Sequence, residues 1–157
     1  MQRVLHVCDG LRIGTARLAC QADLHEEAIT LLLNITRQQP FPKVLPPGMR
    51  CMRVSLSDLP HEPLLEHLTP CVEAIEDECR RGGCTLVYCK NGRSRSASVC
   101  LAYLMHDKGL SLSDALQKLK SIRPGVCPNE GFWEQLQIYE KRIKNTDAEN
   151  ISTVLSQ

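Results

Sequence analysis

The sequence has no apolar run approaching the length of a membrane-spanning helix, and the segment Met1 to Gly14 alternates polar and apolar residues, unlike a signal peptide. Its formal net charge is only +1, and no stripe of basic and aromatic residues is present, so neither nucleic acid nor a membrane is expected as a partner. Repeats and low-complexity linkers are also missing. The 157 residues, 43% of them hydrophobic, are therefore expected to fold as one domain with a substantial core.

Cysteine is abundant but is not arranged for metal binding. The nine cysteines are odd in number and scattered, with no Cys-x-x-Cys pair, and the five histidines show no zinc-ligand spacing. We therefore expect reduced, mostly buried thiols, no metal site, and a cytoplasmic or nuclear location. The cysteines are Cys8, Cys20, Cys51, Cys71, Cys79, Cys84, Cys89, Cys100 and Cys127.

The order of apolar patterns predicts strands that alternate with helices and a helical cluster near the end of the chain. Strands are predicted at Val4–Val7, Leu11–Gly14, Leu31–Ile35, Met52–Leu56 and Thr85–Tyr88. Helices are predicted at Asp23–Thr30, from the N-cap Thr69 through Pro70 to Arg81, and at Ala97–Lys108, Leu112–Ile122 and Glu130–Lys144, the last capped by Asn129. The pattern indicates an α/β fold with a mixed or mostly parallel sheet of about five strands and about six helices. Residues 1–145 form the expected domain, Pro40–Gly48 an irregular loop, and residues 146–157 a polar, frayed tail.

The segment Val87-Tyr88-Cys89-Lys90-Asn91-Gly92-Arg93-Ser94-Arg95-Ser96 runs from an apolar strand through a glycine-containing turn into a helix. Backbone N–H groups in such a turn, with those of the first helical turn, converge on a point that attracts an anion. Gly92 permits the backbone angles of the turn, and the guanidinium of Arg95 can return over the same point. The same field favours the thiolate of Cys89, which is the reactive form. We predict a phosphate cradle with a nucleophile at its base; the alternative is a buried strand-end cysteine followed by a solvated basic turn.

A nucleophile in a phosphate cradle also needs a proton donor for the leaving oxygen. Asp58 is the best candidate, because it directly follows the predicted strand Met52–Leu56 at the edge of the sheet. Glu62 is the second candidate on the same loop and His61 the third. Without the cradle, Asp58 would be read as an ordinary turn aspartate ahead of a proline.

Tyr88 to Ser96 resembles the Cys-x5-Arg signature of the cysteine-dependent protein tyrosine phosphatases. Ala102-Tyr103-Leu104-Met105 and Pro128-Asn129-Glu130-Gly131-Phe132-Trp133 are similar to segments of its small dual-specificity branch. The resemblance covers roughly Leu5 to Arg142 and points to the atypical group, which consists of little more than a catalytic domain. It implies a cofactor-free protein phosphatase that acts on phosphoproteins; the sequence leaves the oligomeric state open, and a monomer is favoured.

The resemblance also implies roles for individual residues. Cys89 would attack phosphorus to give a phosphocysteine intermediate, and Asp58 would protonate the leaving oxygen. Ser96 would donate its hydroxyl to the sulfur in the second step, and Asn34 would brace the loop; a strand-end turn residue is the alternative for Asn34. Arg95 and the backbone N–H groups would hold the phosphoryl oxygens, which needs no metal. These N–H groups belong to Lys90, Asn91, Gly92, Arg93, Ser94 and Arg95.

The chain departs from the family pattern immediately before the nucleophile, where Tyr88 stands in place of histidine. A phenol that is neutral at pH 7 should stabilise the thiolate less than an imidazole, so weak turnover is predicted. Arg93 either tightens anion binding, crowds the mouth of the pocket, or is a solvated loop residue. Two functions compete: a slow phosphatase for phosphotyrosine, with phosphoserine and phosphothreonine as further substrates, and a weakly active phosphoprotein-binding or scaffolding module. A phosphatase for lipid, RNA or nucleotide phosphates is a third and less favoured reading.

Overall fold

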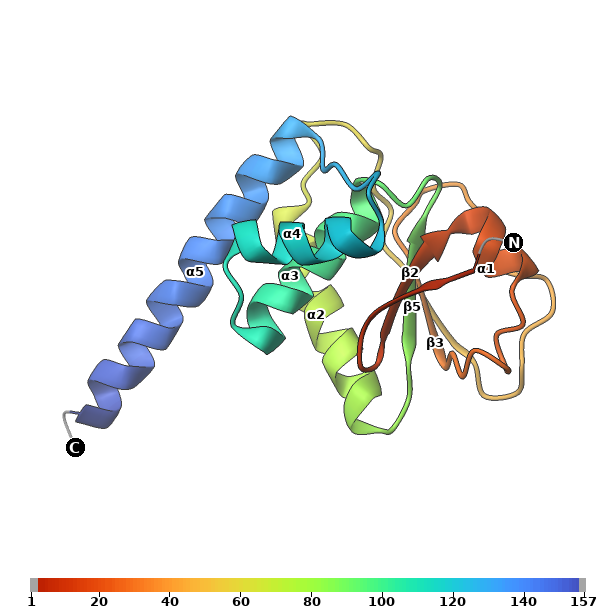
Figure 1. The fold of residues 1–157 in the computed structure, drawn as a ribbon, viewed down its shortest axis with the longest axis horizontal. Coiled ribbons are helices and arrows are strands. Elements are labelled where there is room, and N and C mark those ends of the chain that lie inside the picture. Colours follow the sequence, from red (N-terminus) through yellow and green to blue (C-terminus); the bar gives the residue numbers. More distant parts are fainter. Residues whose placement is uncertain (1–2, 156–157) are drawn as a thin grey trace.

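A five-stranded sheet forms the centre of the computed structural model, which describes residues 3–155 (Figure 1). The strand order is β1-β2-β5-β3-β4, with β1 antiparallel to β2 and the other neighbours parallel. This mixed, mostly parallel sheet confirms the predicted fold class. The strands are β1 (Leu5–Cys8), β2 (Leu11–Thr15), β3 (Leu31–Asn34), β4 (Arg50–Arg53) and β5 (Thr85–Cys89).

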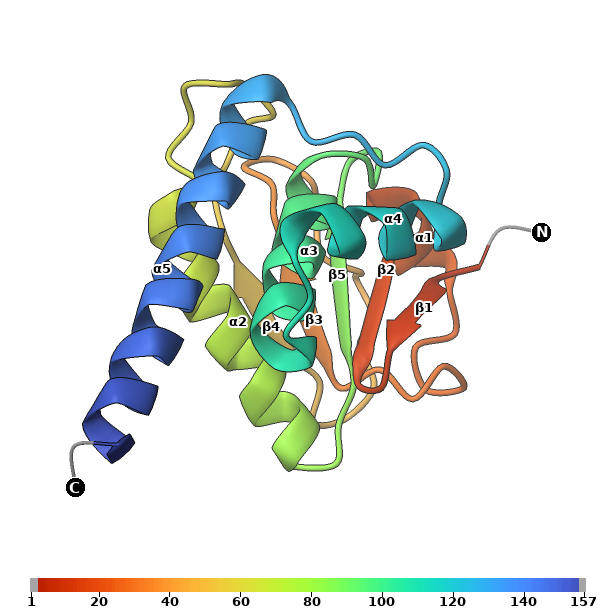
Figure 2. The ribbon, with the colours of Figure 1, turned by 60° about the vertical axis from the view of Figure 1, so that its left-hand side comes forward.

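Helices cover the two faces of the sheet unequally. Helices α2, α3, α4 and α5 lie on one face, and α1 lies on the other beside the proline-rich loop (Figures 1 and 2). The five helices of residues 3–155 are one fewer than the expected number, and none of them is long and apolar enough to cross a membrane. Their bounds are α1 (Ala16–Gln21), α2 (Leu65–Arg80), α3 (Arg95–Lys108), α4 (Leu112–Ile122) and α5 (Glu130–Leu155).

The central strands are buried on both faces, so the core consists of two clusters that share one sheet. Neighbouring residues alternate between them: Leu32 and Leu86 belong to the cluster under α1, whereas Leu33 and Val87 belong to the cluster under the other four helices. This alternation follows from the two-residue period of a strand. It also sends the side chains of Tyr88 and the residue after it to opposite faces.

The helix predicted at Asp23–Thr30 is wrong. The helix in this part of the chain is α1, whose first turn is capped by Thr15 Oγ1, and the residues that follow form turns. The carboxylate of Asp23 caps only a turn, by accepting the N–H of Glu26. Ala28 then has a φ of 58°, in the left-handed region that a helix cannot contain.

Helix α2 begins at Leu65, so Thr69 is not its N-cap and Pro70 lies inside the helix rather than at its start. The earlier start is stabilised from a distance, because the side-chain oxygen of Gln135 in α5 accepts the N–H of Leu65 at 2.8 Å. The fourth strand also ends earlier than the predicted Met52–Leu56, because its parallel partner β3 ends at Asn34.

Helix α5 does not end near Lys144 but continues to Leu155, so the predicted frayed tail is helical as far as the structure describes it. The sequence after Gly131 contains no further glycine or proline to stop the helix. Threonine hydroxyls also bond within it: Thr146 donates to the carbonyl of Arg142 at 2.9 Å.

Candidate active site

The predicted strand, turn and helix around Cys89 are present, and they join β5 to α3. Cys89 is the last residue of β5 and Arg95 the first of α3, with five turn residues between them. Strand β5 lies between β2 and β3, all three parallel, so the turn emerges at the carboxyl edge of the sheet. This edge, where a helix N-terminus faces the strand ends, is the usual ligand-binding position of parallel α/β sheets.

The thiol of Cys89 is enclosed by donors. Its sulfur lies 3.3 Å from the backbone N of Gly92 and 3.1 Å from the hydroxyl oxygen of Ser96, and the residue is only 2% exposed. A backbone N–H and a hydroxyl that both face the sulfur can each donate a hydrogen bond to it, which is the environment a thiolate nucleophile needs. The arrangement brings together Cys89 and Ser96 as the sequence predicts.

Gly92 adopts a φ of +67°, which a residue with a Cβ atom rarely does. A Cβ atom here would also lie 3.1 Å from the carbonyl oxygen of Gly14. Arg123 holds the outer side of the turn, where its Nε and Nη2 donate to the carbonyls of Gly92 and Asn91 at 3.0 and 2.8 Å. Because these carbonyls point outward to Arg123, the turn keeps its N–H groups available on the inner side.

Arg95 is the residue best placed to bind an anion above the sulfur. Its Nη1 donates to the carbonyl of Leu56 at 3.0 Å, which fixes the side chain beside the cavity that Lys90 and Asp58 also line. Its Nε is buried and has no hydrogen-bond partner among the described residues. A buried guanidinium donor without a partner is costly, and an oxyanion bound in the turn would satisfy it.

Asp58 and Arg95 line the same open cavity of about 260 Å³. Asp58 is exposed, and its Oδ1 accepts a hydrogen bond of 2.9 Å from the side-chain amide of Asn129. The structure therefore places the predicted acid beside the predicted cradle. The cavity is lined by Thr36, Arg37, Gln38, Gln39, Leu56, Ser57, Asp58, Lys90 and Arg95.

Asn129 links three parts of the site. Its side-chain oxygen accepts the N–H of Phe132 at 2.8 Å, which confirms it as the cap of α5. Its backbone N–H donates to the hydroxyl of Ser94 in the turn at 3.0 Å, while its side-chain amide holds Asp58. We call residues 57–62, which include Asp58, the acid loop. Asn129 thus fixes the acid loop, the turn and the last helix relative to one another.

The other two acid candidates are placed less favourably. Glu62 is buried, and its Oε1 accepts hydrogen bonds from the Ser57 N–H at 2.7 Å and from Arg37 at 2.6 Å. The Ser57 N–H, followed by Arg37, holds the pKa of Glu62 below its ordinary value. Glu62 is therefore a brace of the acid loop, and neither it nor the exposed His61 lines the cavity.

Tyr88 and Asn34 lie on the opposite face of the sheet from the sulfur. Tyr88 is fully buried in the cluster under α1, and burial holds the pKa of its phenol above the ordinary value, so the ring stays neutral. The side-chain amide of Asn34 donates to the Tyr88 oxygen at 3.1 Å and to the carbonyl of Gln39 at 2.9 Å. Asn34 therefore braces the loop after β3 rather than the turn itself.

The remaining turn residues and the thiols complete the site. Lys90, Asn91 and Arg93 are exposed at its rim, and the carbonyl of Arg93 accepts the N–H of Cys127 at 2.8 Å. Five of the nine cysteines are buried, which confirms that the thiols are mostly buried. Within residues 3–155, no group of three or more His, Cys, Asp or Glu side chains is arranged to hold a metal ion.

Three contributors to the site were not predicted from the sequence: Arg123 behind the turn, the Arg37–Glu62 ion pair, and the hold of Asn129 on Asp58. The only local signal was the position of Asn129 ahead of the last helix. This position predicts that Asn129 caps the helix, but not that it contacts Asp58, 71 positions away in the chain.

A five-stranded mixed sheet in which a cysteine ends the central strand and a turn leads from it into α3 is typical of the cysteine-dependent phosphatases. Comparison with known proteins supports the same class. The family pattern described as "Dual specificity phosphatase, catalytic domain" matches residues 11–142. The chain belongs to this family of protein phosphatases.

Among individual relatives, the chain is similar to dual specificity phosphatase 28. It is 49% identical to the human protein over 142 residues, which cover 90% of this chain and 80% of the relative. It is 52% identical to the mouse protein over 139 residues, covering 88% of this chain and 84% of the relative. A crystal structure of human DUSP28 superimposes with a TM-score of 0.85 at 48% identity, covering 92% of this chain and 97% of that one.

Proposed function

We propose that this chain hydrolyses phosphotyrosine in proteins, and phosphoserine and phosphothreonine in addition, through a phosphocysteine intermediate. The observation that carries the proposal is the position of the Cys89 sulfur between the Gly92 N–H and the Ser96 hydroxyl, at one end of a turn whose other end carries Arg95 with a buried, unpaired Nε. A crystal structure of a mouse putative dual specificity phosphatase, 49% identical to this chain, holds zinc tungstate, and tungstate is a tetrahedral oxyanion like phosphate.

In the first step, the thiolate of Cys89 attacks phosphorus in line with the leaving oxygen. The S–P bond forms as the P–O bond breaks, and the leaving oxygen takes the proton of Asp58. The Nε of Arg95 and the N–H groups of the turn hold the three equatorial oxygens, where the charge of the transition state is spread.

In the second step, a water molecule attacks the phosphocysteine and gives its proton to Asp58, which the first step left ionised. The S–P bond then breaks and inorganic phosphate is released. The hydroxyl of Ser96, 3.1 Å from the sulfur, donates a hydrogen bond to the departing thiolate and so lowers the barrier of this step.

We also propose that turnover is slow. The residue before the nucleophile is Tyr88, whose buried phenol is neutral and provides none of the positive charge that a histidine there would supply. A crystal structure of human DUSP28 carrying a tyrosine-to-histidine substitution superimposes on this chain with a TM-score of 0.87. The nine free cysteines support action in the cytoplasm or nucleus.

A phosphoprotein-binding module is the second candidate. Human tyrosine phosphatase-like serine/threonine/tyrosine-interacting protein, whose name describes interaction, superimposes with a TM-score of 0.80 at 27% identity. The joint presence of Cys89, Ser96 and Asp58 favours the enzyme, because a module that only binds needs neither a nucleophile nor an acid.

Steady-state hydrolysis of an aryl phosphate by the wild type, Cys89→Ser and Asp58→Ala tests the proposal. Cys89→Ser is expected to be inactive, and Asp58→Ala to lose about 10²- to 10⁴-fold in kcat, the range of a lost general acid. His61→Gln, an exposed residue of the same loop, is the control and keeps full activity. Activity that survives in Cys89→Ser would exclude the covalent mechanism, and an inactive wild type that binds phosphopeptides would establish the binding module.

A further inference from the structure

One of the segments that line the active-site cavity has no regular secondary structure. Residues 36–39, which follow β3, contribute four consecutive residues to the lining of the cavity that also contains Asp58, Lys90 and Arg95. We call residues 36–41 the recognition wall, because a peptide bound with its phosphate in the cradle would pass along them. Without a ladder of backbone hydrogen bonds, the shape of such a segment depends on its side-chain contacts.

The recognition wall is held from behind by buried groups. The phenol of Tyr88 donates to the carbonyl of Pro40 at 3.3 Å and accepts from the amide of Asn34 at 3.1 Å. The same amide donates to the carbonyl of Gln39 at 2.9 Å, so two consecutive carbonyls are held through one tyrosine–asparagine pair. Because Asn34 and Tyr88 are both fully buried, these bonds are protected from water.

Arg53 on the edge strand β4 holds the recognition wall from a second direction. Its guanidinium donates to the carbonyls of Thr36 and Gln39 at 3.0 and 2.9 Å and lies over the ring of Phe41, 5.0 Å from the centroid. The Phe41 ring in turn meets the Tyr88 ring edge to face, with centroids 6.5 Å apart.

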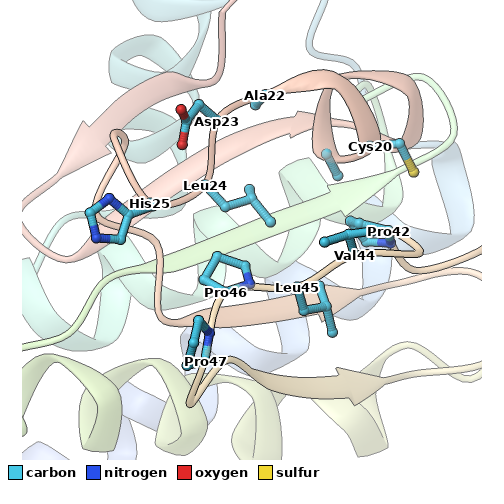
Figure 3. Close-up of a pocket in the computed structure, with 11 residues that line it drawn as sticks. Cys20, Ala22, Asp23, Leu24, His25, Pro42, Val44, Leu45, Pro46 and Pro47 are labelled. Carbon is cyan, nitrogen blue, oxygen red and sulfur yellow. The ribbon is translucent and has the colours of Figure 1, made fainter.

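Beyond Phe41 the loop borders a cavity, and Leu45 and Met49 pack against the core cluster under α1. A cavity of about 460 Å³ lies between residues 42–47 and the end of α1 (Figure 3). Pro42, Leu45 and Pro46 face this cavity across from Leu24. The backbone carbonyls of the recognition wall are therefore held by Tyr88, Asn34 and Arg53. The side chain of Arg37, in the same segment, is held separately by Glu62 and Ser57.

We infer that Tyr88 is a positioning residue for substrate recognition: it fixes the recognition wall, and through that wall the affinity for the residues that flank the phosphorylated one. This role rests on the proposed phosphatase function and differs from the effect of Tyr88 on the thiolate. An imidazole is shorter than a phenol, so a histidine at this position would not reach the Pro40 carbonyl. Compared with a histidine, the tyrosine therefore supplies no positive charge near the nucleophile, but it holds the substrate-binding surface in place.

The test compares KM and kcat for p-nitrophenyl phosphate and for a phosphotyrosyl peptide with several residues on either side. Tyr88→Phe removes the hydroxyl and keeps the ring, and Arg53→Gln removes the second support. Each is expected to raise KM for the peptide about fivefold, the factor that corresponds to one net hydrogen bond, and to change kcat for either substrate less than that. Amide hydrogens of residues 37–39 are expected to exchange faster in both variants.

Tyr103→Phe is the matched control, because Tyr103 is a buried tyrosine of α3 outside this network; it is expected to leave the kinetic constants unchanged. The inference is wrong if Tyr88→Phe leaves the peptide KM unchanged, or lowers kcat for both substrates by the same factor. If the wild type hydrolyses neither substrate, the proposed function fails instead. The recognition wall is then tested by the affinity of the Cys89→Ser protein for the peptide. Adding Tyr88→Phe should weaken this binding about fivefold, and an unchanged affinity would contradict the inference.

Discussion

Gly131, in the first turn of α5, lies directly against the backbone of Pro60 in the acid loop, and a Cβ atom at this position would overlap the Pro60 carbonyl. Gly131→Ala is therefore expected to displace the loop that carries Asp58. We predict a fall in kcat for substrates with poor leaving groups and a loss of about 1–3 kcal/mol in the free energy of unfolding, the usual cost of overpacking.

Gly125→Ala provides the comparison for this substitution. A Cβ atom at Gly125 would meet only Arg93 Nε, at an ordinary contact distance of 3.8 Å, so activity and stability should be retained. Leaving-group dependence of kcat and urea unfolding measure the two effects. Equal behaviour of the two alanine variants would show that the contact with Pro60 does not position the acid.

At the level of single residues, sequence reasoning finds groups whose role depends on near neighbours. Cys89, Gly92 and Ser96 lie within one short segment, so the strand, turn and helix around them determine where they point. The hold of Asn129 on Asp58 depends instead on the packing of α5 against the acid loop, which no local pattern encodes.

Among the structural elements, the acid loop makes a contribution to the stability of the fold that depends on pH. The pKa of Glu62 is lowered below its ordinary value of 4.5, first by the Ser57 N–H and then by Arg37. A carboxyl group whose pKa is lower in the folded than in the unfolded chain stabilises the fold above about pH 4.5, and this contribution is lost as the pH falls through the folded-state pKa.

Glu62→Gln should therefore have a lower urea midpoint than the wild type at pH 7, and the difference should shrink as the pH falls below 4.5. Urea unfolding at a series of pH values measures it. Glu134→Gln, at an exposed position of α5, should show no such pH-dependent difference. A difference in urea midpoint between Glu62→Gln and the wild type that stayed constant below pH 4.5 would contradict this account of the loop.

The extension of α5 beyond the family domain contributes little to the core. From Asn145 to Leu155 the side chains are exposed, including Ile151, Val154 and Leu155. Truncation after Lys144 is expected to leave kcat unchanged and to cost less than about 1 kcal/mol of stability, because exposed positions bury little apolar area. Thermal unfolding and aryl phosphate hydrolysis check this, and a truncated protein that fails to fold would show that the extension is a structural part of the domain.

Helices and strands were predicted correctly where neighbouring residues determine their ends, and incorrectly where residues distant in the sequence determine them. Helix α4 matches its prediction because Ser111 caps it at its own N-terminus. The start of α2 was missed because its support comes from Gln135. Helix α1 was missed because its six residues carry no helical periodicity beyond what a loop would show.

For the whole molecule, the two core clusters share one sheet and should unfold together. Leu32→Ala and Leu33→Ala remove fully buried side chains from opposite clusters, and each is expected to cost about 2–5 kcal/mol. The single tryptophan, Trp133, packs against only one cluster, whereas circular dichroism reports on all helices. Coincident transitions by both probes are predicted for both variants. A Leu32→Ala protein in which the tryptophan transition does not shift would show that the faces unfold independently.

The fold as a whole serves to bring the Cys89 turn, the acid loop and the recognition wall to one edge of the sheet. The most direct test of this account is mass spectrometry of the acid-quenched Ser96→Ala protein after mixing with an aryl phosphate, because loss of the Ser96 hydroxyl should slow hydrolysis of the intermediate. The account predicts one added phosphoryl group, located on Cys89. Turnover without any adduct, or an adduct on another residue, would contradict it.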